Sequence, residues 1–176
     1  MTSESIRTPS SRRDPEYRAL RRLARATAGG LPEKPLDALE QVADIARDLT
    51  HARYAALVVV DEQDSVEGFV VSGMATEEER KLKAAPQGHG PLGTMRKDGL
   101  SVRVNDLEGY ERAFGFPPKH PEMKTLLGVP IWAGGALHGA LYVTDRDEGK
   151  PFRDDDELML RVLARHAGAI IAERWY

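Results

Sequence analysis

Apolar residues recur at helical spacing in two long segments. In residues 35–49, PLDALEQVADIARDL, they return every three or four positions, the spacing that places side chains on one face of a helix. Residues 153–176, RDDDELMLRVLARHAGAIIAERWY, predict a long closing helix whose acidic first turn suits the positive end of the helix dipole. A shorter helix is predicted over residues 76–85, where Thr76 and Glu79 fit a capping box.

Five other segments have the apolar content and the alternation that are typical of strands. They are residues 52–61, 67–73, 100–106, 125–133 and 136–145. Turn residues separate the first two segments at Asp61–Asp64 and the last two at Gly134–Gly135. Both pairs therefore predict hairpins, and hairpins indicate an antiparallel sheet with helices packed on it, an α+β domain.

Residues 1–34 differ from the rest of the chain and form a basic extension ahead of a domain at residues 35–176. The first 30 residues hold seven arginines against three acidic residues. A short amphipathic helix is predicted there, with Asp14 as its cap, Pro15 in its first turn and Gly29–Gly30 at its end. Such a helix can contact a membrane surface, DNA or a partner; packing on its own domain or on a dimer mate is the simplest interpretation.

The composition narrows the functional classes. Of 176 residues, 41% are hydrophobic, enough for the core of one domain, and the net charge of −3 argues against a protein that coats nucleic acid. The absence of cysteine excludes disulfides, thiol catalysis and cysteine-based metal sites. There is no apolar signal region and no run of the roughly 18 apolar residues that a membrane span needs. The sequence therefore predicts a cytoplasmic protein without a membrane span.

A long irregular segment, residues 107–123, carries the most versatile side chain. It is rich in Gly and Pro and contains His120 in GFPPKHPEM, just ahead of an apolar run. A loop of this length inside a compact domain is more often functional than idle. His120 is open to three interpretations: an exposed loop residue, a catalytic base, or a metal ligand inside a pocket.

The sequence contains only partial matches to the motifs of common enzymes. GHGPLG, residues 88–93, has the glycine spacing of a dinucleotide-binding turn, but it follows a helical pattern rather than a strand. No zinc spacing appears, and Ser72 and Ser101 lie on predicted strands without a nucleophile elbow. We therefore expect a binding protein and not an enzyme.

From Leu36 to Tyr176 the sequence resembles a GAF domain, the small-ligand sensing module of signalling proteins. The resemblance is carried by LLGVPIWAGGALHGALYVTD, by the closing FRDDDELMLRVLARHAGAII and by ARYAALVVVD. It implies a GAF fold with a central antiparallel sheet of five to six strands and helices packed on it. GAF domains that react through a thiol or attach a bilin usually rely on cysteine, which is absent here.

The loop also resembles that of GAF domains in bacterial redox- and oxygen-sensing histidine kinases, some of which bind haem. That resemblance implies that His120 is the axial iron ligand and that Tyr142, in ALYVT, lies on the opposite side of the haem. Where family members often read HPPM, this chain reads HPEM, with Glu122. The apolar residues that flank His120 in the sequence suit a porphyrin. Alternation along residues 136–145 puts Tyr142 and His138 on one face of the predicted strand. The predicted pocket residues are His120, Tyr142, Phe116, Met123, Leu127 and His138.

The favoured hypothesis is thus a stand-alone GAF sensor that binds haem and detects a diatomic gas or a redox state. One alternative is a haem-free GAF domain that holds a small anion or metabolite in the same pocket. Another is a dimerising adaptor for a kinase or regulator. We expect a homodimer through the helices at residues 36–50 and 155–174, with Trp175 as an exposed apolar position on that surface.

Overall fold

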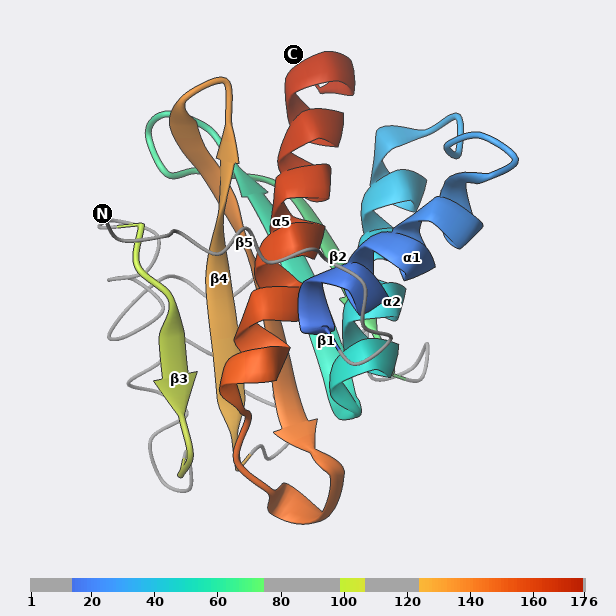
Figure 1. Cartoon of the computed structure of the whole chain (residues 1–176). Coiled ribbons are helices and arrows are strands. Elements are labelled where there is room, and N and C mark those ends of the chain that lie inside the picture. Colours follow the sequence, from blue (N-terminus) through green and yellow to red (C-terminus); the bar gives the residue numbers. More distant parts are fainter. Residues whose placement is uncertain (1–13, 75–98, 107–123, 176) are drawn as a thin grey trace, which may run out of the picture.

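The described residues form a five-stranded antiparallel sheet with helices α1, α2 and α5 on one side (Figure 1). The computed structural model describes residues 14–74, 99–106 and 124–175. The strands lie in the order β2-β1-β5-β4-β3. The elements are α1 (Pro15–Thr27), α2 (Pro35–Thr50), β1 (Ala52–Val60), β2 (Val66–Ser72), β3 (Val102–Val104), β4 (Leu126–Ala133), β5 (Ala136–Arg146), the short 3₁₀ helix η1 (Asp147–Gly149) and α5 (Asp154–Arg174).

The predicted fold class is confirmed. All four strand pairings are antiparallel, and the two predicted hairpins join β1 to β2 and β4 to β5. The turn between β4 and β5 has positive φ at both Gly134 (58°) and Gly135 (82°), a conformation that glycine adopts without strain. The predicted helix at residues 76–85 lies outside the described residues.

Alternation along the central strands separates two layers of side chains. On β5, Leu141 and Val143 point toward the helices, into a large aliphatic core. We call this side of the sheet the helical face. The helices α1, α2 and α5 all lie over this face (Figure 1). Helix α5 approaches β4 closely, because a Cβ at Gly168 would lie 2.1 Å from the backbone oxygen of Trp132. A side chain at that position would force the helix away from the strand.

Helix α1 packs against α5 and, to a smaller extent, α2. As predicted, Asp14 caps it: the carboxylate accepts hydrogen bonds from the backbone N–H groups of Glu16 and Tyr17. An ion pair of 2.7 Å between Arg22 and Asp48 fastens α1 to α2. Helix α1 therefore covers part of the helical surface that the sequence assigned to a dimer interface.

The expectation that Trp175 is an exposed position is wrong. Its indole is partly buried against the core, and its N–H donates to Glu67 at 3.1 Å. A Cβ at Gly68 would lie 2.6 Å from the indole ring, so the missing side chain on β2 makes room for the tryptophan. The end of α5 is thereby attached to the edge strand of the sheet. Among the described helices, none is long and apolar enough to span a membrane.

Candidate ligand-binding face of the sheet

The sheet has a second buried face, opposite the helices, and the candidate site lies there. We call it the second face. Its side chains come from the three central strands and form a separate cluster of Tyr54, Ala56, Val58, Val60, Leu126, Ala140 and Tyr142. Partly buried apolar residues of β2 and β3 pack against this cluster, including Phe69 and Val102. Among the described residues, the cluster has fewer members than the helical core, and it contains two phenol groups.

Tyr142 occupies the middle of the second face. Its Cα partners are Ala56 on β1 and Gly128 on β4, so its neighbours on both sides are small. Ala140, two positions back on β5, is also small and buried. The directly opposed neighbours of Tyr142 are therefore small, and a bulky member of the cluster, Leu126, lies diagonal to it. The ring is nevertheless only 5% exposed.

Thr144 adds a polar group next to Tyr142 on the same face. Its Cα partners are Tyr54 on β1 and Leu126 on β4, both members of the second-face cluster. The residue is 1% exposed, and its Oγ1 has no hydrogen-bond partner in the part of the chain that the structure describes. A buried hydroxyl without a partner costs about 1–3 kcal/mol, so such groups in native proteins call for an explanation. A polar ligand atom would satisfy it.

Leu127 is not a wall of this site, which corrects the sequence-based expectation. It is fully buried, but in the helical core, because odd-numbered residues of β4 point toward the helices. Its neighbour Leu126 points to the second face and packs in the cluster with Tyr142. The apolar run LLGVPI is buried on both faces, and composition alone does not reveal which leucine faces which side.

His138 is also separated from Tyr142. The register of β4 and β5 shifts between Ile131 and Trp132, so the simple alternation used to place His138 does not extend to the hairpin. Its Nδ1 lies 3.0 Å from the carbonyl oxygen of Val60. In the neutral ring, a proton on Nδ1 would donate to that oxygen. His138 lines a hollow of about 410 Å³ beside Ala172 of α5, at the hairpin end of the sheet.

The remaining predicted pocket residues, His120, Phe116 and Met123, lie outside the described residues. Within the described ranges, no group of three or more His, Asp or Glu side chains is arranged to hold a metal ion. The structure therefore places Tyr142 on the second face together with Leu126 and Thr144, and it places Leu127 and His138 elsewhere.

The family model for the GAF domain matches residues 34–172, most of the chain. The chain belongs to the GAF domain family. Solved GAF structures share the fold with it. One is the GAF domain of a phosphoenolpyruvate-protein phosphotransferase from Coxiella burnetii, with a TM-score of 0.71 and 22% identity, covering 92% of this chain and 95% of that one. The equivalent domain from Acinetobacter has a TM-score of 0.68 and 18% identity, covering 89% and 92%.

A third solved structure that shares the fold is that of an enzyme. It is the free methionine-R-sulfoxide reductase from Neisseria meningitidis, solved in complex with its substrate. The TM-score is 0.68 at 17% identity, and the match covers 94% of this GAF chain and 95% of that chain. At these identities, the three structures show the shared fold and do not transfer an activity.

Thr144 was missed by sequence analysis although a signal for it was present. The alternation that selected Tyr142 on β5 selects Thr144 two positions later with the same logic. A threonine on a strand is ordinarily a good strand former, and only the burial of its unpartnered hydroxyl singles it out.

Proposed function

We propose that this GAF domain is a small-molecule sensing module whose ligand binds against the second face of the sheet. The observation that carries the proposal is the Thr144 hydroxyl, buried and without a partner among the described residues, in an apolar wall beside Tyr142. Small pockets with apolar walls and a few placed polar groups are the usual form of ligand sites. The ligand is therefore mainly apolar and carries at least one hydrogen-bonding atom.

We further propose haem as that ligand, on the strength of the loop resemblance. The described part of the site fits a porphyrin in its chemistry: Val58, Val60 and Leu126 supply an apolar wall, and Ala140 leaves space. His120 would hold the iron, and Tyr142 would set the polarity on the opposite side. Bound haem supplies an iron centre that responds to a diatomic gas or to redox state.

An absorption spectrum tests the haem proposal. The protein is expressed with a haem precursor, next to His120→Ala and the control His51→Asn. His51 is an exposed histidine at the end of α2 with a φ of 55°, a conformation that asparagine tolerates. A Soret band that is lost or shifted in His120→Ala but kept in His51→Asn supports ligation by His120. No band in the wild type, even after reconstitution with hemin, overturns it.

The broader sensing proposal is tested separately, by thermal-shift screening of small anions and metabolites. Ligand binding to the folded state raises the melting temperature. A compound that stabilises the wild type but not Thr144→Val supports a haem-free ligand on the second face. If neither haem nor any compound binds through Tyr142 or Thr144, the second face is a closed core and the module is structural, as in an adaptor.

A further inference from the structure

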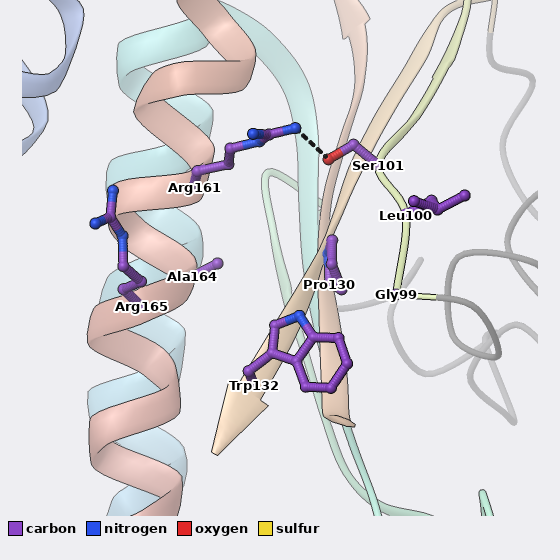
Figure 2. Close-up of a pocket in the computed structure, with 8 residues that line it drawn as sticks. All are labelled: Gly99, Leu100, Ser101, Pro130, Trp132, Arg161, Ala164 and Arg165. Atoms are coloured by element: carbon purple, nitrogen blue, oxygen red, sulfur yellow. Dashed lines mark hydrogen bonds between the residues drawn. The ribbon is translucent and has the colours of Figure 1, made fainter. Parts of the chain in front are cut away.

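A groove at the edge of the sheet, separate from the second-face site, has the composition of a second binding site. It runs between α5 and the β3–β4 edge and has a volume of about 400 Å³. Figure 2 shows α5 on one side of the groove and the strands on the other, with Trp132 between them. The lining residues are Gly99, Leu100, Ser101, Pro130, Trp132, Arg161, Ala164 and Arg165. None of them belongs to the Tyr142 cluster.

One wall of the groove is apolar and held in place. The Trp132 residue is 52% exposed, which is unusual for so large an apolar residue. One edge of its ring rests on Gly99, where a Cβ would lie 2.4 Å from an indole carbon and φ is +69°. Leu100, 62% exposed, extends the same wall. On the helix, the small Ala164 lies between the two arginines and leaves the groove open (Figure 2).

The polar end of the groove is formed by Arg161, whose contacts with neighbouring polar side chains are long. Arg161 reaches from α5 toward β3, and its guanidinium lies 3.4 Å from the Ser101 hydroxyl oxygen (Figure 2). Its other contact, to Glu157, is 3.5 Å long. Both distances exceed those of good charge-assisted hydrogen bonds, which are about 2.7–2.9 Å. Because Arg103 also binds Glu157, at 3.3 Å, that carboxylate is shared between two cations.

The balance of charge along this wall is positive. Counting only residues that the structure describes, this wall has the three cations Arg103, Arg161 and Arg165 and the two carboxylates of Asp154 and Glu157. No ion pair is found for Arg165 among the described residues. An incoming anion would therefore gain a strong contact at Arg161 without displacing a strong one.

The groove suits a small molecule better than an added β-strand. Strand β3 pairs with β4 only from Leu126 to Gly128, and the groove lies beyond that pairing. An extended peptide there would need a continuous row of backbone donors on β4. Pro130 has no N–H, so the row is interrupted, a feature typical of protected sheet edges.

We propose that this groove binds a small planar organic anion, with its carboxylate on Arg161 and the Ser101 hydroxyl and its ring against Trp132. An arginine matches a carboxylate with two parallel hydrogen bonds, and an indole offers a broad apolar surface to a ring. The inference does not depend on haem or on the second face. It gives the domain a second ligand-binding site at the sheet edge.

The probe for the test is 2-naphthoate, and the control ligand is 2-naphthamide, which has the same ring without the charge. The readout is the indole N–H signal in a ¹H–¹⁵N NMR titration. The chain has two tryptophans, so Trp175, whose N–H donates to Glu67 in another part of the molecule, is an internal reference. Trp132→Phe assigns the two signals.

We expect saturable movement of the Trp132 signal with the acid, at least tenfold weaker binding of the amide, and no movement of Trp175. Arg161→Gln should weaken 2-naphthoate binding at least tenfold, while Arg161→Lys, which keeps the charge but not the fork, should lie between. Arg21→Gln, an exposed arginine on α1, is the matched control and should bind as the wild type does.

Three results would overturn the proposal: no saturable shift at Trp132, equal affinity for acid and amide, or unchanged binding in Arg161→Gln. Loss of binding in Arg21→Gln would also count against it, because it would show a general effect of net charge. Arg161 has a side chain 55% exposed, so its variants should fold, and equal urea midpoints would establish this.

Discussion

The two faces of the sheet differ in what they bury, although they share the same strands. The helical face joins buried side chains of α1, α2, α5 and the three central strands in one continuous aliphatic core. In the described part of the chain, the second face has a smaller cluster that includes Tyr54 and Tyr142 and lies beside the Thr144 hydroxyl, which has no hydrogen-bond partner there. The Thr144 hydroxyl does not help stability by itself, because a buried polar atom costs free energy unless it is satisfied.

Neighbouring residues of a single strand therefore have different roles, one set in the fold and the other in the candidate site. On β5, Leu141 and Val143 serve the fold, while Ala140, Tyr142 and Thr144 form the candidate site. Substitutions at neighbouring positions of this strand should therefore separate stability from binding.

Leu141→Ala should produce the largest loss of stability. Leu141 is fully buried on the helical face, and removing its side chain leaves a cavity, at a cost of about 3 kcal/mol. Tyr142→Phe, one position later, should cost about 1 kcal/mol or less while weakening ligand binding. Urea denaturation and ligand titration of both variants measure the two effects. Equal losses of stability would show that the two faces are not specialised as described.

Gly168→Ala should destabilise the domain by about 2 kcal/mol, because the new methyl group would clash with the backbone at Trp132. Neither partner can yield by turning a side chain. Gly29→Ala, at a position with nothing within 4 Å of the added Cβ, is the matched control and should change stability little. The prediction fails if thermal unfolding shows the two variants to be alike.

Thr144→Val should stabilise the unliganded protein by about 1 kcal/mol, because it removes a buried hydroxyl that has no hydrogen-bond partner within the described ranges. Thr50 is its matched control: it is equally buried, but its hydroxyl donates to the Ala46 carbonyl oxygen at 2.7 Å. Thr50→Val should destabilise by a similar amount. If Thr144→Val is instead destabilising in urea denaturation, the hydroxyl has a partner in solution, and the argument for a polar ligand atom falls.

His166 should give the smallest effect, visible only as a pH dependence. Burial lowers the pKa of this α5 histidine from its ordinary 6.5. The unfolded chain therefore takes up its proton at a higher pH than the folded chain, so stability is full above about pH 6.5 and declines as the pH falls below it. Urea midpoints between pH 7.5 and 5.5 should slope in the wild type and be flatter in His166→Gln. Parallel slopes would contradict this assignment.

Much of the fold was predictable because its signals are local. Helical spacing in residues 35–49, alternation in the strands and the turn at Gly134–Gly135 each determine one element, and the order of elements determines the antiparallel sheet. The cap at Asp14 was predicted for the same reason, since it depends on bonds to residues two and three positions away.

The candidate site was harder to predict because it depends on which way each side chain points. One residue of register decides that Leu126, not Leu127, faces Tyr142, and a bulge near the hairpin redirects His138. The partial burial of Trp175 depends on a glycine more than a hundred positions earlier in the chain. Such contacts are determined by tertiary packing, and no local sequence pattern predicts them.

The alternation of β5 has a consequence for signalling. Tyr142 and Thr144 share a backbone with Leu141 and Val143, which are packed against the helical layer. If the proposed ligand shifts Tyr142, the backbone of β5 has to move with it, and a close-packed core cannot absorb that movement by compression. Under the proposed function, the movement would reach the helical layer through the strand itself. Helix α5 packs on β4 at Gly168 and is attached to β2 through Trp175, so it would move with the sheet.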